Sequence, residues 1–590
     1  MNIFWFIIDS VRTFRSGQDD RDRIDIIDEF AKDSVEFTNC FTSAPSSLLA
    51  SGALFSGLPS VYIARHFNDW KYTNRNISTI RSLVEQHNYS SYSLLDTRNQ
   101  REKLQNLIPP LKRKYLPKGY NLYDYSWKNN DLTKIFAYIM KSHKPNSPFC
   151  FNFWYDCRRD PQTSFHVSKA IDIIKENGYY DNSIIIMNSD HGYPDPRTKI
   201  NEAFFSNLSH DMILTDDNIK TPLLIKYPNC PENTKINHIV GHIDILPTIY
   251  DILGVPYEKI ISRYQGESLL PIINGTEGND RIRRTDTRLA MDTGKITSLT
   301  SKNFKYIYFY DDKSELLFDR NNDPDERNDI AKANTSSTRK ALNDSKELLK
   351  DYSESLFSYH KETLNKSLIK GFSKYAKKYN HTNPKIIIIA NTDIDLLRIL
   401  TSGLSQLFNH PKLYLLTSSD NDYSKISVED IINVKKINSE NLKNIKLDSY
   451  KIAIYLTENS RRVILKDAIV TAVKKIKSKH YILLNYNFEP YLYFSFRSIF
   501  SYFKIYFDWD IKRHFYKEEP IFFLKDLGFL IKKLFLAVFL RDKKIKHIDV
   551  LAAKEIMEYR NSHLKKAKGV KEMSESELEY ETERIKNWRE

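Results

Sequence analysis

The 590-residue sequence predicts a chain of the α/β class with two separate hydrophobic cores. Short apolar runs of strand length alternate with helical stretches in the N-terminal part, and the same alternation begins again after Pro384. Hydrophobic residues make up 41% of the chain and charged residues 28%, which is typical of a globular protein. We therefore expect an α/β sandwich followed by a second α/β domain.

Four apolar runs in the N-terminal part are predicted to be buried parallel strands. They are residues 3–8, 149–154, 183–188 and 222–227. Residues 165–177 carry apolar side chains at helical spacing, and Gly178 follows where a C-terminal cap is expected. A helix therefore leads into the strand that ends at Asn188.

The second α/β pattern has a Rossmann-like order of strands and helices. Its predicted elements are a strand at 385–390, a helix at 393–408, and strands at 412–417, 451–456 and 480–485. The turn after its first strand, residues 390–393, has no glycine-rich phosphate cradle, so a dinucleotide site is not supported. The pattern resembles the N-terminal half of glycosyltransferases of the heptosyltransferase kind, and we assign it no activity.

The domain boundary is predicted near residue 365. A charged, Ser- and Asn-rich helical stretch from about Asn334 to Lys361 separates the two α/β patterns. We expect a first domain at 1–365, a second at 366–555, and a charged helical tail at 556–590.

Charge and cysteine content limit the partners and the compartment. The formal net charge of +14 and the pI near 9.1 favour an anionic partner. The many lysines occur together with much Asn, Ile and Tyr, so we do not expect nucleic acid to be that partner. The four cysteines fit no zinc or disulfide pattern, and residues 1–8 lack a basic leader, which favours the cytoplasm.

A basic aromatic segment lies near the end of the chain, at residues 491–547. Its apolar run is too short and too often charged to span a bilayer, but its composition suits a surface helix at an anionic leaflet. We expect peripheral contact with the inner membrane face through this segment. The alternative is that its aromatic residues form the core of the second domain.

Three groups of polar residues stand at the ends of predicted N-terminal elements. Asp9 ends the first strand, Asp190 and His191 follow the strand at 183–188, and Ser47 lies in a Ser-rich segment between them. Loops at the carboxyl ends of parallel strands converge on one crevice. Two acids and an imidazole can hold a divalent ion, beside which a hydroxyl becomes a better nucleophile.

The order and spacing of these segments resemble the sulfatase branch of the alkaline-phosphatase superfamily over roughly residues 1–350. Further matching segments are 83–89, 241–248, 265–271, 315–319 and 323–328. The resemblance implies an alkaline-phosphatase/sulfatase-like α/β sandwich. It also implies that Ser47 is the nucleophile and completes the shell of one divalent ion, Mn²⁺, Mg²⁺, Ca²⁺ or Zn²⁺, held by Asp9, Asp190 and His191.

The same resemblance implies three substrate-binding residues. Arg158 falls where relatives place a substrate-contacting His, and His210 falls where they place a His or Lys near the transferred group. Both are expected to bind anionic oxygens and to act in catalysis. Arg12 also follows the first metal ligand, as in many relatives, and its alternative interpretation is pairing with an acid inside the fold.

The sequence departs from the family pattern around the nucleophile. Family members convert the Cys or Ser of a Cys/Ser-x-Pro-x-Arg motif to formylglycine, whereas this chain has Leu49 for the proline and Ser51 for the arginine. Ser47 is therefore expected to remain serine. One acid at Asp9-Ser10, a hydroxyl nucleophile and an Asp-His pair resemble instead the phosphoethanolamine and phosphoglycerol transferases.

These residues predict a metal-dependent hydrolase or transferase that acts through Ser47 on phosphate-type esters of a surface glycan or lipid-linked saccharide. The first alternative is a sulfuric ester hydrolase, that is, a sulfatase. The second is a catalytically retired binding module. Each residue taken singly also has an ordinary structural role, and only their convergence favours the metal site.

Overall fold

The computed structural model describes a large part of the chain, which divides by its internal contacts into one compact unit containing Met1–Tyr352 and a second beginning at Ser353. The described residues are 1–13, 24–63, 77–95, 107–109, 111–118, 128–143, 145, 148–157, 160–194, 210–259, 261, 264–276, 281–288, 295–310, 312–379, 383–390, 394–417, 433–436, 449–457, 477–485 and 490–492. Helix α12 (Ser336–Tyr379) contains both the division and the predicted boundary near residue 365.

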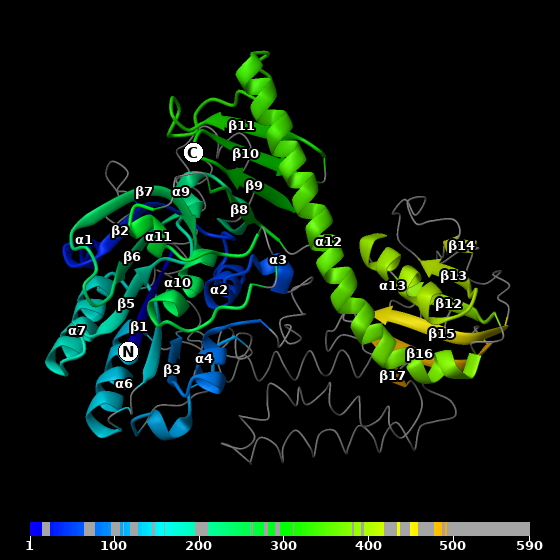
Figure 1. Cartoon of the computed structure of the whole chain (residues 1–590), viewed down its shortest axis with the longest axis horizontal. Helices are drawn as coiled ribbons and strands as arrows, with labels where there is room; N and C mark the ends of the chain where they lie inside the picture. The colour runs from blue at the N-terminus through cyan, green and yellow to red at the C-terminus, as the bar shows by residue number, and fades with distance from the viewer. Residues whose placement is uncertain are drawn as a thin grey trace, which may run out of the picture. The chain divides into compact units, whose positions relative to one another are not determined.

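A seven-stranded sheet forms the centre of the first unit, with the strand order β3-β4-β1-β5-β6-β2-β7 (Figure 1). The strands are β1 (Asn2–Asp9), β2 (Val35–Phe41), β3 (Ser90–Leu95), β4 (Phe149–Asp156), β5 (Ser183–Asn188), β6 (Lys220–Lys226) and β7 (Thr234–Gly241). Strand β1 lies between β4 and β5 and runs parallel to both. The α/β class is confirmed, and three of the expected parallel strands are present.

The fourth expected parallel strand was predicted with the wrong direction. Residues 222–227 fall largely within β6, which runs antiparallel to both β5 and β2. A strand that is buried on both faces gives the same apolar run in either direction. Its direction is set by the connection that precedes it, and the apolar pattern contains no signal for that.

Alternation along β1 assigns its side chains to two faces. Phe4 and Phe6 stack on aromatic rings of β4, and Phe4 also meets Phe136 of α6. Trp5 points to the other face, where its ring lies 5.3 Å from that of Phe55 in α2. Asp9 shares the face of Trp5, so it lies on the same side of the sheet as α2.

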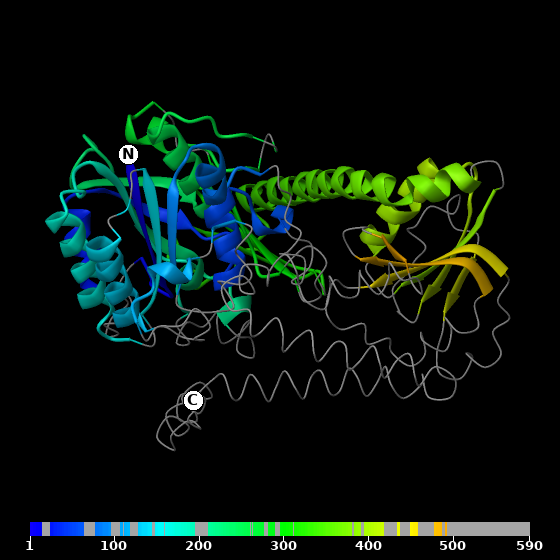
Figure 2. The ribbon, with the colours of Figure 1, turned by 90° about the horizontal axis from the view of Figure 1, so that it is seen from below.

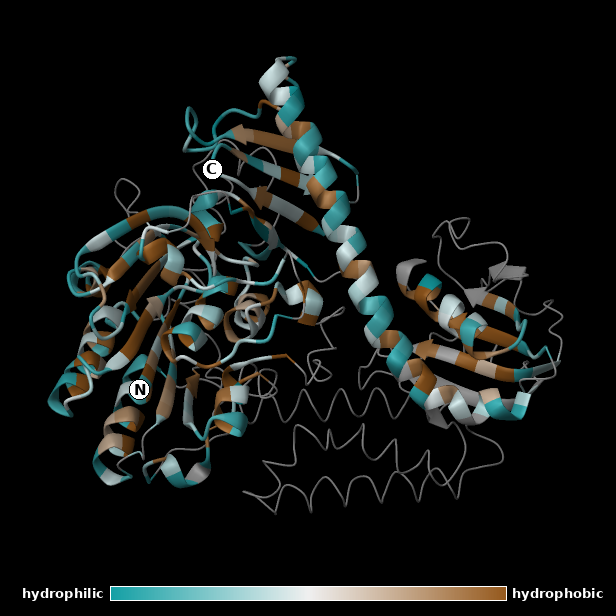
Figure 3. Ribbon diagram, in the orientation of Figure 1, coloured by the Kyte–Doolittle hydropathy of each residue, from teal (hydrophilic) through white to brown (hydrophobic). Residues whose placement is uncertain are grey.

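Helices cover both faces of this sheet, and the strands between them are the most hydrophobic part of the unit (Figures 2 and 3). The helices on the α6 side are α1 (Asp25–Ala31), α6 (Asn129–Ser142) and α7 (Thr163–Glu176). On the α2 side are α2 (Ser47–Ser56) and α10 (Ile245–Ile252). The remaining short helices are α3 (Ser60–Ile63), α4 (Ile80–Gln86), η2 (Arg113–Tyr115), η3 (His210–Met212), α9 (Asp216–Ile219), η4 (His242–Asp244) and α11 (Leu270–Ile273). The predicted cap is present, because Gly178 follows α7 with φ of 73°.

A four-stranded antiparallel sheet completes the first unit, with the order β11-β10-β9-β8. Its strands are β8 (Arg283–Asp286), β9 (Ile296–Thr300), β10 (Phe304–Phe309) and β11 (Glu315–Asp319). Ile307 and Phe318 of this sheet share a buried cluster with Phe41 at the end of β2. The small sheet therefore packs on the end of the large one.

The second unit contains a six-stranded sheet with the order β14-β13-β12-β15-β16-β17. Its elements are β12 (Lys385–Ala390), α13 (Ile394–Leu407), β13 (Lys412–Thr417), β14 (Asn433–Lys436), β15 (Ser449–Thr457), β16 (Lys477–Asn485) and β17 (Pro490–Leu492). Numbered along the chain this order is 3-2-1-4-5-6, so the predicted Rossmann-like arrangement is confirmed. Only the last strand is antiparallel to its neighbour.

No helix within the described residues combines the length and the apolarity needed to cross a bilayer. Apart from residues 491–492, the basic aromatic segment 491–547 lies outside the described residues, and so does the predicted tail at 556–590. The expectations for both segments stay predictions.

Candidate active site

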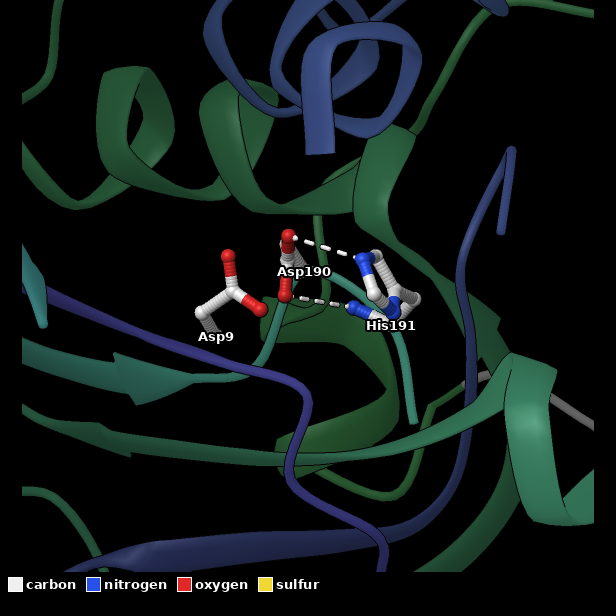
Figure 4. Close-up of side chains that lie close together, drawn as sticks. All are labelled: Asp9, Asp190 and His191. Carbon is white, nitrogen blue, oxygen red and sulfur yellow. Dashed lines mark hydrogen bonds and ion pairs between the residues drawn. The ribbon is translucent and has the colours of Figure 1, made fainter. Parts of the chain in front are cut away.

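The structure brings together the four residues expected to form a metal site. Asp9 is the last residue of β1, Asp190 and His191 follow directly after β5, and Ser47 is the first residue of α2. Ligand atoms of Asp9, Asp190 and His191 lie within 4.8 Å of one another. Figure 4 shows the two carboxylates side by side with the imidazole next to Asp190.

The separations within this group are close to hydrogen-bonding distances. Ser47 Oγ lies 3.1 Å from Asp9 Oδ2 and 3.3 Å from His191 Nε2. The same nitrogen lies 3.3 Å from Asp190 Oδ2. Asp190 and His191 are almost fully buried, whereas Asp9 and Ser47 are partly exposed. The nucleophile and one carboxylate are therefore open to solvent, while the other two groups form the floor.

The hydrogen bond of Nδ1 determines which ring nitrogen of His191 faces the site. Nδ1 of His191 lies 2.7 Å from the carbonyl oxygen of Gly192. A carbonyl only accepts, so Nδ1 carries the proton, and in the neutral ring Nε2 presents a lone pair to Ser47 and Asp190. This orientation is typical of a histidine that ligates a metal.

Electrostatics within the group favour a cation. Burial, followed by the negative charge of Asp9, raises the pKa of Asp190 well above its ordinary value. Burial also raises the pKa of Asp9, but the charge of His191 and hydrogen bonds from Ser10 and other neighbours outweigh it and lower that pKa. Asp190 Oδ2 accepts no hydrogen bond within the described residues. Two adjacent carboxylates with an unsatisfied buried oxygen match the donor set of a divalent ion.

Helix α2 presents its N-terminus to the same point. Ser46 precedes it in extended conformation, and Gly57 ends it with φ of 67°. The first backbone N–H groups of a helix point outwards and favour negative charge. Ser51, at the position where the family motif has arginine, donates its hydroxyl to the carbonyl of Ser47. The hydroxyl of Ser51 is therefore engaged within the helix itself.

Sequence reasoning missed two residues that hold the carboxylates. Ser10 donates its backbone N–H to Asp190 and its hydroxyl to Asp9. Trp154, on the neighbouring strand β4, has its Nε1 3.4 Å from Asp9 Oδ2. The two polar groups of Ser10 could have been suspected from its position after a metal ligand, but Trp154 gave no signal within its apolar run.

The predicted substrate-binding residues have different outcomes. His210 begins η3, and its ring centroid lies 5.2 Å from that of His191, so it stands beside the metal-binding group. Arg12 is buried and donates its Nε to the backbone carbonyl of Tyr193. Arg158 lies outside the described residues. The role of His210 at the transferred group stays a prediction with a suitable position.

An acid and an arginine that the sequence analysis did not single out accompany His210. Asp211 Oδ1 lies 2.8 Å from His210 Nε2. Burial raises the pKa of Asp211, but the hydrogen bond and charge of His210, together with the charges of His191 and Arg288, lower it overall. Arg288 is exposed and follows β8, whose Asp286 donates its backbone N–H to Ser43, four residues before Ser47. The rim of the site therefore carries both an acid, Asp211, and an exposed arginine, Arg288.

The segment 241–248 supports the site without entering it. The carboxylate of Asp244 is fully buried, forms an ion pair with Arg283 at 2.7 Å and accepts the backbone N–H of Glu267. A Cβ on Gly266 would lie 1.7 Å from the carbonyl oxygen of Ile243, so only glycine fits there. These contacts fasten the loop at 265–267 to the start of α10.

Two family profiles match the first unit of this chain. A profile described as sulfatase matches residues 162–255, and one described as N-sulphoglucosamine sulphohydrolase, C-terminal, matches residues 209–354. An ulvan-active sulfatase of Formosa agariphila is 28% identical over 145 residues, which are 24% of this chain and 22% of that protein. Arylsulfatase K of Bos taurus is 27% identical over 180 residues, 29% of this chain and 31% of that protein. The matches span a third or less of these relatives' lengths.

Two solved structures have a similar fold. A 2-O GAG sulfatase shares 17% identity at a TM-score of 0.46 and aligns over 60% of this chain and 92% of its own. The phosphonate monoester hydrolase of Agrobacterium radiobacter shares 14% identity at a TM-score of 0.46 and aligns over 60% of this chain and 96% of its own. The family profiles and the curated relatives agree with the sequence motifs in one respect: residues 162–354 of this chain are similar to the sulfatase family.

Proposed function

We propose that the first unit is a metal-dependent hydrolase or transferase of anionic esters that uses the Ser47 oxygen as its nucleophile. The main support is the convergence of four electron-pair donors, which are Asp9 Oδ2, Asp190 Oδ2, His191 Nε2 and Ser47 Oγ. With Nδ1 of His191 protonated, the protons that the described residues bring to these four atoms are those of the Ser47 hydroxyl and of Trp154 Nε1. Such a group is stable when a cation replaces the missing protons.

The residues fit a divalent ion. Asp9, Asp190 and His191 would hold it, and the oxygen of Ser47 would complete its shell. When bound, the ion supplies a positive charge that lowers the pKa of the hydroxyl and neutralises the oxygens of the ester. Mn²⁺, Mg²⁺, Ca²⁺ and Zn²⁺ are all compatible with mixed oxygen and nitrogen ligands.

The residues of the chain divide the reaction into two steps. In the first, the deprotonated Ser47 oxygen bonds to phosphorus, the bond to the ester oxygen breaks, and the leaving alcohol takes up a proton. His210, half-buried beside His191, is placed to give that proton. In the second step, water or an acceptor alcohol gives a proton to His210 and attacks the phosphorus of the phosphoserine. The bond between phosphorus and the Ser47 oxygen breaks, which restores the deprotonated oxygen that began the first step. Arg158 and the N-terminus of α2 would bind the anionic oxygens.

We further propose that phosphate-type esters are preferred. The window from Ser47 to Ser51 lacks the proline and arginine that direct formylglycine formation in the family, so Ser47 would stay an ordinary serine. A phosphoserine can be resolved by a second attack, whereas a sulfated serine is difficult to discharge. The names of the curated relatives and of the family profiles support the second candidate, a sulfuric ester hydrolase.

The proposed substrate is the ester of a surface glycan or a lipid-linked saccharide. Support comes from the glycan named in the ulvan-active relative and from the exposed Arg288, whose charge acts on Asp211 beside the site. We propose that the reaction takes place in the cytoplasm, and that the basic segment 491–547 brings the protein to the inner membrane face.

Matched 4-nitrophenyl phosphate and 4-nitrophenyl sulfate test the proposal. The purified full chain is stripped with a chelator, reloaded with each of the four ions, and assayed with both esters. Faster release from the phosphate supports phosphoryl transfer, and faster release from the sulfate supports the sulfatase. Tight metal binding with no turnover of either ester, or of a panel of phosphorylated and sulfated saccharides, would identify a binding module instead.

A further inference from the structure

Ser10 connects the two carboxylates of the site. Its backbone N–H donates to Asp190 Oδ1 at 3.1 Å, and its hydroxyl donates to Asp9 Oδ1 at 2.5 Å. The residue is only 4% exposed and has φ of 63°, a left-handed conformation that non-glycine residues seldom adopt. Such a conformation is strained for a residue other than glycine and is retained where the surrounding structure requires it. Here it aims both polar groups of one residue at the metal-binding acids.

These bonds hold Oδ1 of each carboxylate and leave Oδ2 of each directed at the other groups of the site. Asp190 Oδ1 accepts a second N–H, from the backbone of His191 at 2.9 Å, whereas Asp190 Oδ2 is buried and accepts none within the described residues. On Asp9, Oδ1 is held by the hydroxyl of Ser10, and Oδ2 is the oxygen that faces Ser47. Each acid is therefore prepared to give one ligand atom.

We propose that Ser10 is a positioning residue that restricts both acids to single-oxygen ligation and thereby selects Zn²⁺ over Ca²⁺. The inference rests on the proposed function only in assuming that these residues hold an ion. Four donors, one of them an imidazole nitrogen, match the four-coordinate shell of Zn²⁺. Ca²⁺ takes about 6–8 oxygen ligands and commonly uses both oxygens of a carboxylate. The hydrogen bonds to Oδ1 of Asp9 and Oδ1 of Asp190 disfavour that mode of binding here.

The residue type at position 10 also limits the charge of the site. A serine leaves two carboxylates, Asp9 and Asp190, whose charges one divalent ion balances. An acid at position 10 would add a third negative charge and a further oxygen ligand, both of which favour Ca²⁺. Ser10 thus acts in two ways. Its hydrogen bonds orient Asp9 and Asp190, and its side chain adds no third carboxylate to the site.

Two variants separate these contributions. Ser10→Gly keeps the backbone N–H and tolerates the left-handed conformation, but it removes the hydroxyl that holds Asp9. Ser10→Asp adds a carboxylate, and Asp also tolerates this conformation. Ser46→Gly is the matched control, because Ser46 adjoins the nucleophile but its side chain makes no capping hydrogen bond.

The readout is metal affinity in the chelator-stripped full chain, measured by calorimetry with Zn²⁺ and with Ca²⁺, together with the visible spectrum of the Co²⁺-loaded protein. The unaltered chain should bind Zn²⁺ at least about 1000-fold more tightly than Ca²⁺ and give the intense absorption of tetrahedral Co²⁺. Each Ser10 variant should lower the ratio of Zn²⁺ affinity to Ca²⁺ affinity by about tenfold or more. Ser46→Gly should leave this ratio unchanged.

Several results overturn the inference. A Zn²⁺-to-Ca²⁺ ratio that is unchanged in both folded Ser10 variants shows that Ser10 has a merely structural role. Preference of the unaltered chain for Ca²⁺, or an octahedral Co²⁺ spectrum, contradicts the four-coordinate site. Binding of neither ion by folded protein overturns both this inference and the proposed function. Zn²⁺ selectivity without turnover of any ester leaves the inference standing and rejects the proposed function alone.

Discussion

The side-chain oxygen of Ser47 lies 3.1 Å from Oδ2 of Asp9, although 38 positions separate the two residues in sequence. Asp9 is placed by β1, and Ser47 by the N-terminus of α2. The packing of Trp5 against Phe55 holds this helix to the same face of the sheet. The nucleophile and a metal-binding acid are thus fixed by a buried aromatic contact between rigid elements.

Replacing the nucleophile should abolish turnover without unfolding the protein. Ser47→Ala removes the attacking oxygen and leaves the partly exposed helix start otherwise intact, so we expect a loss of at least about 1000-fold in kcat. The matched control is Ser46→Ala, which should retain most of the activity. Steady-state kinetics on the phosphate ester, with circular dichroism to verify folding, gives the answer.

The mass of the peptide that contains Ser47 tests the identity of the nucleophile directly. We expect the mass of unmodified serine in the resting protein and a gain of one phosphoryl group after rapid quenching with substrate. Ser47→Cys should not create a sulfatase, because the following residues lack the family's maturation signal. A resting mass that corresponds to formylglycine, or sulfate turnover that exceeds phosphate turnover, would refute phosphoryl transfer and support the sulfatase.

Asp190→Asn and His191→Ala should each lower metal content. The two side chains form the buried floor of the site, so removing either one deletes one of the three His and Asp ligands that the described residues bring together. Elemental analysis of dialysed protein should show less than about half of the original metal. The control is Asp172→Asn, which changes an exposed acid on α7 and should leave the metal content unchanged. Full metal content in both folded site variants would mean that the ligand assignment is wrong.

A chain that ends after residue 365 should stay folded and bind metal. Helix α12 packs on the first unit through Tyr352, whose ring lies 5.5 Å from that of Tyr62 and only 3.5 Å from the guanidinium of Arg284. Further along, Leu368 packs against Gly403 of the second unit. The cut therefore retains the contacts of the first unit. Thermal unfolding and metal analysis check this, and an insoluble or unfolded product would show that the two units depend on each other for folding.

Lys305→Met should destabilise the first unit by about 3–5 kcal/mol. Lys305 is fully buried and bridges Asp216 at 2.8 Å and Glu326 at 2.6 Å, so its loss removes the shortest ion pair of each acid. Lys302→Met, at an exposed position just before the same strand, is the control and should change stability by less than about 0.5 kcal/mol. Denaturant unfolding of the 1–365 chain gives both values. Equal stabilities for the two variants would contradict a role for the buried ion pairs.

The same cluster predicts a dependence of stability on pH. Burial raises the pKa of Asp216, but the charges of Lys305, Arg320 and Lys220 outweigh it and hold that pKa below its ordinary range. A lowered pKa gives stability that is present above the unfolded value, near 4, and is lost as pH falls towards the folded value. The difference in unfolding free energy between the unaltered chain and Asp216→Asn should therefore shrink between about pH 4 and pH 2. A constant difference across this range would show that Asp216 has an ordinary pKa.

The sequence by itself determined the class of the fold and the residue types of the site. Runs such as 183–188 and 412–417 coincide with β5 and β13, because a strand buried on both faces needs an unbroken apolar segment. Asp9, Asp190 and His191 were identifiable because polar residues directly after such strands must lie at the sheet's edge. The apolar residues that directly precede them in the chain are enough to identify these positions.

Only the tertiary structure decided how the site is held and how its groups are oriented. The antiparallel direction of β6, the contact of Trp154 with Asp9 and the position of Arg288 near Asp211 depend on chain connections and packing that leave no local pattern. The left-handed Ser10 is the clearest case, because its conformation is imposed by two carboxylates, one adjacent and one 180 positions away. A side chain's hydrogen-bond partner is set by distance in space, and the sequence specifies that distance only through the whole fold.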